Sequence, residues 1–263
     1  MIPARLSKGE IFMQIGAQMF TVREHTQNEL DFAETIRKIA AIGYKGVQVS
    51  AIGLIPAGVV ADICDSNGVS IVSTHTNPIR ILNETEAVIA DHKTMGTRFC
   101  GIGMMPGQYH NDGVDGILRF VEDYRMAAEK LAAEGIQLTY HNHDFEFEKR
   151  GGKLILDLLA EHSPMFFVLD TFWIQSGGGD PSWWIRKLAG RVEIIHFKDM
   201  GVVAGQRRFM EIMEGNILWP PIFEACKAAG VEWAFVEQDD TYGRDPFDSL
   251  RISFENINKS GYL

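Results

Sequence analysis

The sequence predicts an α/β fold, a single (β/α)8 barrel, on three observations. Short apolar runs rich in β-branched residues alternate with longer segments of helical periodicity along almost the whole chain. Eight such runs fit into 263 residues, which is close to the usual length of one such barrel. No run is followed by a G-x-G-x-x-G or G-x-x-x-x-G-K-[ST] motif, so an open nucleotide-binding sheet is disfavoured.

The eight candidate strands are mostly continuous apolar runs, as expected for strands buried on both faces of a parallel sheet. In chain order they are residues 13–17, 46–49, 70–74, 98–101, 137–141, 166–170, 193–196 and 233–237. Strict alternation of strands and helices implies parallel strands joined by right-handed crossovers. The longest segments that we expect to be irregular are residues 103–111, 143–152 and 200–215.

Several helix boundaries carry local signals. Asp180-Pro181 and Asp245-Pro246 each place a capping carboxylate before a proline at the first helical position. Glycine follows four of the helical segments, a few residues before the next strand, at Gly43, Gly68, Gly135 and Gly230. The repeating unit is therefore strand, loop, helix, glycine and the next strand.

The composition is that of a soluble globular protein with an acidic balance. There are 25 basic and 35 acidic residues, for a net charge of −10 and a pI near 5.3. This balance disfavours nucleic acid and anionic membranes as partners, because both need a positive surface. Three cysteines without C-x-x-C spacing, Cys64, Cys100 and Cys226, indicate reduced thiols and a cytoplasmic location.

The amino-terminal segment contains no apolar run of the length that a signal peptide or membrane span requires. We expect residues 1–10 to be a disordered leader and residues 11–263 to form one barrel domain. The sequence does not decide whether the protein is a homo-oligomer, since exterior aromatics such as Trp183 and Phe247 suit either an interface or helix packing.

Four consecutive strands end on a polar side chain able to bind a metal ion. Each is the first polar residue after its apolar run: His141, Asp170, His196 and Glu237. The active site of such a barrel lies at the carboxyl ends of the strands, so these side chains should meet there. Any one of them alone would more often be a helix cap or a loop hydrogen-bonding group. Together they predict one divalent ion, Mn²⁺, Co²⁺, Zn²⁺ or Fe²⁺, held by mixed nitrogen and oxygen ligands.

Two further residues are candidates for catalysis. His143 follows His141 by two positions and should face the barrel mouth, where it could bind the metal, contact substrate or transfer protons. Lys198 stands in the same relation to His196, and either stabilises an enolate oxygen or pairs with Asp199.

Three residues are candidates for substrate binding. His75 ends the third strand, although an ordinary loop histidine is equally compatible with its position. Glu146 alternates with aromatic residues after the fifth strand, as a substrate contact or a solvent-facing carboxylate would. Arg208, next to Arg207, could grip a phosphate or carboxylate, or be a solvated loop charge.

Five motifs in chain order carry a resemblance to a known family: YHNHDFEF, VLDTFW, IIHFKDM, MEGNILWPPIF and FVEQDDTYGRDPFDSL. They resemble the xylose isomerase-like barrel superfamily, whose members are often labelled sugar phosphate isomerase/epimerase, and the resemblance extends back to IGAQMFTVRE in the first strand. In that family Glu, Asp, His and Glu at the ends of strands five to eight hold the metal. Asp170, His196 and Glu237 match three of these, whereas His141 stands where members with LENH carry the first Glu.

The resemblance implies a divalent-metal-dependent isomerase or epimerase that acts on a small keto- or aldo-sugar. The expected chemistry is proton abstraction next to the carbonyl through a metal-stabilised enediolate, with Glu237 or His143 as general base. The missing strand-five Glu is one of the two carboxylates that flank the substrate in the family's epimerases, which puts a symmetrical two-base epimerisation in doubt.

Three alternatives remain. Elimination of water or a leaving group from a keto-sugar or keto-inositol is the first, because members that dehydrate keto-inositols have a His-rich strand five. A barrel that binds sugar without turning it over is the second. Metal-dependent endonucleases share the fold, but a net charge of −10 disfavours a protein that must bind phosphate backbones.

Overall fold

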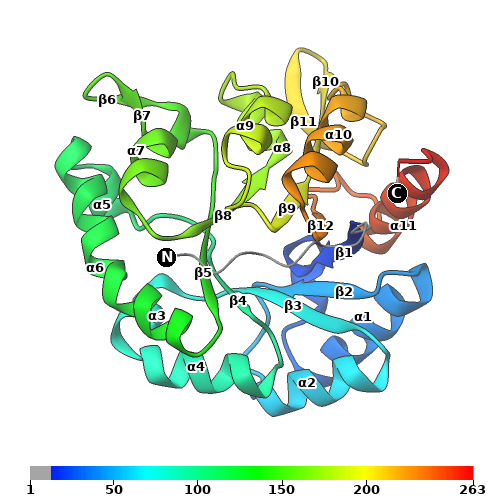
Figure 1. Cartoon of the computed structure of the whole chain (residues 1–263). Coiled ribbons are helices and arrows are strands. Elements are labelled where there is room, and N and C mark those ends of the chain that lie inside the picture. The colour runs from blue at the N-terminus through cyan, green and yellow to red at the C-terminus, as the bar shows by residue number, and fades with distance from the viewer. Residues whose placement is uncertain (1–12, 263) are drawn as a thin grey trace.

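Eight parallel strands close into a barrel in the computed structural model, which describes residues 13–262 (Figure 1). In barrel order they are β1 (Gln14–Gln18), β2 (Gly46–Val49), β3 (Ser70–His75), β4 (Phe99–Ile102), β5 (Gln137–His141), β8 (Phe166–Asp170), β9 (Ile194–Phe197) and β12 (Trp233–Val236). Strand β12 pairs with β1 and closes the ring. The predicted fold class is confirmed, and each predicted strand is found with ends that differ by at most one residue. The proposed leader, residues 1–10, lies outside the described residues.

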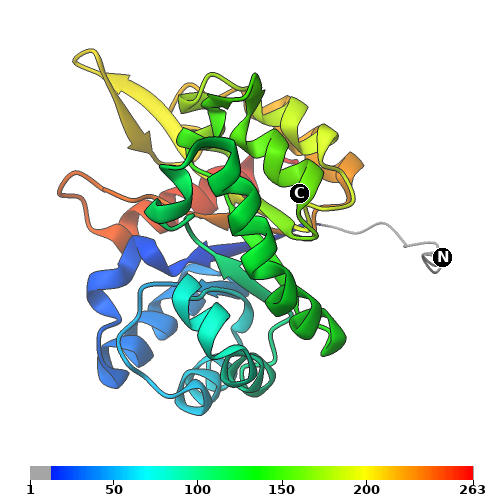
Figure 2. The same cartoon turned by 90° about the vertical axis from the view of Figure 1, so that its left-hand side faces the viewer.

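Helices surround the barrel on its outside (Figures 1 and 2). They are η1 (Met19–His25), α1 (Glu29–Ile42), α2 (Ala57–Ser66), α3 (Pro78–Asn83), α4 (Thr85–Thr94), α5 (Gly107–His110), α6 (Gly113–Ala133), η2 (Phe145–Phe147), α7 (Ile155–His162), α8 (Thr171–Ser176), α9 (Pro181–Lys187), α10 (Trp219–Ala229) and α11 (Pro246–Lys259). The two predicted acid-proline starts are confirmed, because Asp180 accepts a hydrogen bond from the Trp183 amide and Asp245 from the Phe247 amide.

The barrel interior is filled by large apolar side chains in one layer and by polar ones in another. Phe99, Val168, Ile194 and Phe235 form a buried apolar cluster. Gly16 makes room for it, because a Cβ atom there would lie 2.5 Å from the Phe235 ring. The apolar layer closes the barrel, so the polar residues at the carboxyl ends of the strands form the floor of a cavity.

The segment 200–215, which we expected to be irregular, contains a hairpin. Strands β10 (Asp199–Val203) and β11 (Gln206–Met210) pair antiparallel and project from one end of the barrel (Figure 2). Ala204 and Gly205 connect them, both with positive φ, as the tight turns of hairpins require. Ala-Gly is a weak turn signal compared with Asn-Gly, which is why the expectation was wrong. A shorter pair, β6 (Lys149–Arg150) and β7 (Lys153–Leu154), lies within and just beyond segment 143–152.

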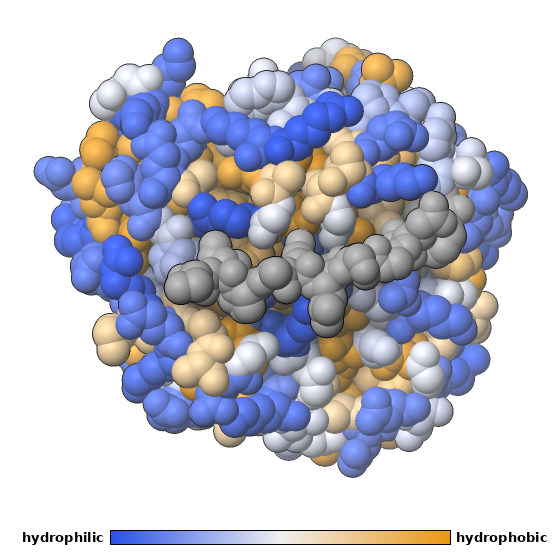
Figure 3. Space-filling model, in the orientation of Figure 1, coloured by the Kyte–Doolittle hydropathy of each residue, from blue (hydrophilic) through white to orange (hydrophobic). Residues whose placement is uncertain are grey.

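The surface is mixed in character. The face shown in Figure 3 carries mainly hydrophilic residues with scattered hydrophobic ones, as water-exposed surfaces do. Of the two aromatics considered for an interface, Phe247 is buried and Trp183 is exposed. Within residues 13–262, no helix combines the length and the apolar character needed to cross a membrane.

Candidate metal centre and substrate cavity

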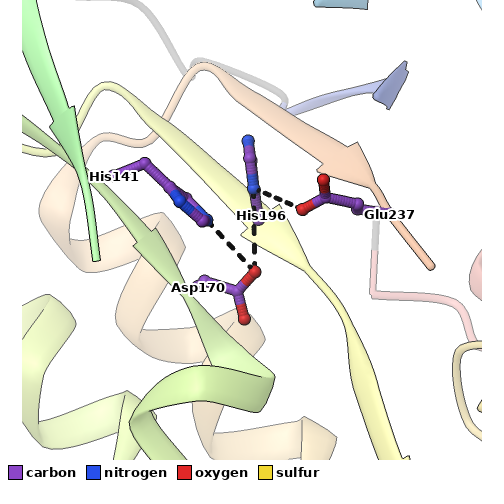
Figure 4. A group of neighbouring side chains, drawn as sticks. All are labelled: His141, Asp170, His196 and Glu237. Atoms are coloured by element: carbon purple, nitrogen blue, oxygen red, sulfur yellow. Dashed lines mark hydrogen bonds and ion pairs between the residues drawn. The ribbon is translucent and has the colours of Figure 1, made fainter. Parts of the chain in front are cut away.

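The four predicted metal ligands converge at the carboxyl ends of neighbouring strands β5, β8, β9 and β12 (Figure 4). One potential ligand atom of each lies within 4.8 Å of the other three, and all four residues are buried. His196 Nδ1 is 2.9 Å from Glu237 Oε2 and 3.7 Å from Asp170 Oδ2. His141 Nε2 is 3.3 Å from the same Asp170 oxygen. The barrel thus brings together the set that the sequence predicts.

Hydrogen bonds behind the two imidazoles fix which nitrogen faces the centre. His141 Nδ1 lies 3.1 Å from the Gly103 carbonyl oxygen, to which it can only donate. His196 Nε2 bonds in the same way to Oε1 of Gln48, at the end of β2. When the imidazole is neutral it carries one proton, so the other nitrogen of each ring turns a lone pair towards carboxylate oxygens. Burial acts to lower the pKa of His196, but Glu237 and Asp170 outweigh it and raise that pKa, which favours a proton on the nitrogen that faces them when no metal ion is bound.

This arrangement fits a divalent cation. Lone pairs of two imidazoles and two carboxylates pointing at one another in a buried space repel, and a proton or a cation between them removes the repulsion. Two carboxylates balance the charge of a divalent ion, and imidazole with carboxylate is a donor set typical of Mn²⁺, Fe²⁺, Co²⁺ and Zn²⁺. A set with His141 in place of a carboxylate therefore still has four donors of the kinds that these ions bind.

Asp170 has two tasks. Its Oδ1 accepts a hydrogen bond from the Trp173 amide at 2.9 Å and so caps α8, while Oδ2 faces the imidazoles. Its own amide donates to the Asn142 side chain. The start of the helix and the neighbouring strand thus fix the orientation of this ligand.

Lys198 lies next to the ligand set and is almost fully buried. Its Nζ is 3.1 Å from Glu237 Oε2, 3.4 Å from Asp170 Oδ2 and 2.7 Å from Asp239 Oδ1. Burial acts to lower the pKa of Lys198, but the three carboxylates outweigh it and raise that pKa above its ordinary value. Lys198 therefore stays charged, and it is Asp239, not Asp199, that pairs with it.

The charge of Lys198 acts in turn on the ligands. Burial raises the pKa of Asp170 and of Glu237, but Lys198 and the imidazoles outweigh this and hold both pKa values below their usual range. Both ligands are therefore ionised, as metal binding requires. Asp199 instead accepts hydrogen bonds from the Met213 amide and the Trp219 indole, which secures the loop after β11.

A cavity of about 570 Å³ opens at the ligand set. His141, Glu237, Lys198 and the two further predicted histidines, His75 and His143, all line it. The centre of the His141 ring lies 5.3 Å from that of the His75 ring and 4.8 Å from that of the His143 ring. Three imidazoles from β3, β5 and the loop after β5 are therefore grouped at one wall.

His75 and His143 are neutral. Burial lowers the pKa of His75 well below its ordinary value and that of His143 to about 3. His75 Nε2 and His143 Nδ1 are buried and make no hydrogen bond within residues 13–262. Neutral imidazoles with a free nitrogen can accept a proton or bind a hydroxyl group.

Glu146 and Arg208, which we predicted to bind substrate, do not line this cavity. Glu146 is fully buried, accepts hydrogen bonds from the Tyr140 hydroxyl and the His143 amide, and has its pKa raised to about 8 by burial. The chain leaves β5 after His141 and turns through η2. The alternation of side-chain directions along the strand therefore stops before Glu146, whereas we had assumed that it continued to this residue. Arg208 lies on β11 with its guanidinium over the Tyr242 ring.

Three residues at the site were not predicted from the sequence. Gln48 orients His196, Asp239 pairs with Lys198, and Trp173 packs 5.2 Å from the His143 ring. Asp239 and Trp173 lie within motifs that mark the strand ends, in FVEQDD and VLDTFW. Gln48 has no such signal, since it lies inside an apolar run.

The fold is that of a known family of barrels, and the chain belongs to that family. The sequence profile of the family described as xylose isomerase-like TIM barrel matches residues 36–258. The family resemblance seen in the motifs is thereby confirmed. Among proteins of curated function, none matches the chain significantly.

Solved structures similar to this one include a sugar phosphate isomerase/epimerase from Parabacteroides distasonis, with a TM-score of 0.82 and 23% identity over 96% of this chain and 100% of that one. An L-ribulose 3-epimerase has a TM-score of 0.71 and 16% identity, covering 94% of both chains. A probable 3-DHS dehydratase from Bacillus anthracis has a TM-score of 0.69 and 14% identity, over 94% of this chain and 99% of that one. At these identities the similarity shows the fold.

Proposed function

We propose that the protein is a divalent-metal-dependent isomerase or epimerase of a small keto- or aldo-sugar. The observation that carries the proposal is the buried set His141, Asp170, His196 and Glu237, of which His141 and Glu237 line a cavity. The names of two similar structures, sugar phosphate isomerase/epimerase and L-ribulose 3-epimerase, support a carbohydrate substrate.

The residues of the cavity supply the groups that proton abstraction next to a carbonyl needs. A divalent ion held by the four ligands would polarise the carbonyl as a Lewis acid. Glu237 is ionised and His143 is neutral with a free nitrogen, so either can accept the proton. Lys198 keeps a positive charge next to Glu237, where it favours negative charge developing on the substrate oxygen.

Elimination from a keto-sugar is the second candidate, and His141 is the observation that favours it. With an imidazole at this strand end, Glu237 is the one carboxylate of the family's acid-base pair that is present. Elimination needs only one base, so Glu237 would remove a proton from one face of the substrate, and the neighbouring neutral His143 would assist the leaving group. The similarity to a probable dehydratase agrees with this alternative.

Calorimetric titration of Mn²⁺ into chelator-stripped protein tests the metal centre. We expect one site per chain, lost in Asp170→Ala, because that substitution removes a ligand carboxylate that faces both imidazoles. Absence of Mn²⁺, Co²⁺ and Zn²⁺ binding would leave a sugar-binding barrel without catalysis.

Hydrogen exchange tests the chemistry. Incubation of free ketoses with the Mn²⁺-loaded protein in D₂O should place deuterium next to the carbonyl, as detected by mass spectrometry. Glu237→Gln should lower the exchange rate by about 10²–10⁴-fold, as expected for the loss of a general base. The matched control is Glu224→Gln on α10, an exposed carboxylate remote from the cavity that should leave exchange unchanged. Undiminished exchange in Glu237→Gln would remove Glu237 from this role.

A further inference from the structure

The walls of the substrate cavity contain little positive charge. Of the described residues that line it, Lys198 is the single lysine or arginine. Its ammonium group has three donor hydrogens and is surrounded by three carboxylates, those of Asp170, Glu237 and Asp239, at 3.4, 3.1 and 2.7 Å. The positive charge of Lys198 is therefore already shared among three carboxylates before a substrate enters.

The charges of the cavity balance without a substrate. A divalent ion in the ligand set offsets Asp170 and Glu237, and Lys198 offsets Asp239. A phosphate monoester, with a charge of roughly −1.5 to −2 near neutral pH, would have no counter-charge there and would meet the partly exposed Asp239. Burying an unpaired charge is unfavourable by much more than burying a neutral hydroxyl group.

Arg23, Arg207 and Arg208 have partners of their own and do not line the cavity. Arg23 donates to the backbone oxygens of Phe20 and Asp239 at 2.8 and 3.1 Å. Arg207 donates to the Ser176 carbonyl oxygen, and Arg208 lies over the Tyr242 ring. None of these three guanidinium groups belongs to the lining residues.

The rest of the wall is apolar or neutral. Phe20, Met104 and Trp173 offer apolar surface against which the C–H face of a sugar can pack. Ser50 and the unpartnered Nε2 of His75 offer neutral hydrogen-bonding groups suited to hydroxyls.

We propose that this cavity selects an uncharged carbonyl sugar and rejects phosphorylated ones. The reasons are that three carboxylates already offset the charge of Lys198 and that Phe20, Met104 and Trp173 form an apolar wall. This inference rests on the proposed function for the carbonyl sugar itself. The charge selectivity rests on the cavity walls.

Paired ligands test the selectivity. Binding of D-ribulose and D-ribulose 5-phosphate, and of D-fructose and D-fructose 6-phosphate, is measured by thermal stabilisation of the Mn²⁺-loaded protein over a range of ligand concentrations. We expect each free ketose to bind at least about tenfold more tightly than its ester, because the ester buries charge without a partner.

A substitution in the wall provides a second test. Met104→Arg places a cation at a half-exposed lining position, and should reduce the preference for the free sugar by about tenfold through attraction of the ester. Met104→Gln, of similar length and without charge, should keep the preference. An unchanged preference in Met104→Arg would contradict the charge-based explanation.

The outcomes separate this inference from the proposed function. Equal or tighter binding of the esters overturns the inference, as does a lack of binding by every free ketose, whatever the hydrogen exchange shows. Tight binding of free ketoses without deuterium uptake from D₂O supports the inference and contradicts the isomerase function.

Discussion

At the scale of single residues, the proposed metal centre depends on side chains outside the set of four candidate ligands. Gln48 is buried on β2, across the barrel from β9, and its Oε1 accepts the proton of His196 Nε2. Its amide also donates to the Ser73 hydroxyl, which holds the Gln48 side chain in this orientation. Through this contact the tautomer of His196 is chosen, and with it the nitrogen that faces Asp170 and Glu237.

Replacement of this residue should weaken metal binding while leaving all four ligands in place. We expect Gln48→Leu to reduce Mn²⁺ affinity by about 10–100-fold, the usual effect of losing a hydrogen-bond partner behind a ligand. Calorimetric titration measures the affinity. Gln48→Glu is the matched control, since it keeps an acceptor for His196 Nε2 and should retain most of the affinity. Equal affinities in Gln48→Leu and the unchanged protein would show that the tautomer is set by other contacts.

At the scale of elements, the site is built where strands end and helices begin. Asp170 is both the last residue of β8 and the cap of α8, so one residue joins the ligand set to the helix start. Near His75, strands β3 and β4 pack closely, because a Cβ atom at Gly101 on β4 would lie 2.4 Å from the Thr74 carbonyl oxygen on β3. The backbone at these strand ends thus limits where the imidazoles can lie.

The two tasks of Asp170 can be separated by substitution. Asp170→Asn and Asp170→Ala should both lose Mn²⁺ binding, but only asparagine keeps an oxygen to accept the Trp173 amide hydrogen bond. In chelator-stripped protein, Asp170→Asn should therefore have a free energy of unfolding about 1 kcal/mol higher than Asp170→Ala. Denaturant titration of both variants measures the difference. Equal stabilities would show that the cap contributes nothing to folding.

At the scale of the whole molecule, barrel closure brings four residues that are 26 to 96 positions apart in sequence to one centre: His141, Asp170, His196 and Glu237. A metal ion bound there links β5, β8, β9 and β12. Because the unfolded chain cannot hold this arrangement, metal binding should stabilise the folded state.

Removal of metal should therefore lower the thermal stability. At a free metal concentration of 100 times Kd the stabilisation is about 2.7 kcal/mol, which corresponds to a rise in Tm of roughly 5–10 °C for a protein of this size. Differential scanning calorimetry with Mn²⁺ and with excess chelator measures the shift. Asp170→Ala should show none of it, and an equal shift in that variant would place the bound ion elsewhere.

Local sequence determined the eight strands and the order of the four candidate metal ligands. An apolar run that stops at His141, Asp170, His196 or Glu237 is a local pattern, and parallel strands in a closed barrel bring such ends to one rim. The tertiary structure alone decided what lies around them. Contacts between distant segments pair Lys198 with Asp239 and orient His196 through Gln48. Where the chain leaves its strands decides that neither Glu146 nor Arg208 lines the cavity. Strand alternation specifies a side chain's direction only within the strand, and beyond its last residue packing and hydrogen bonding set that direction.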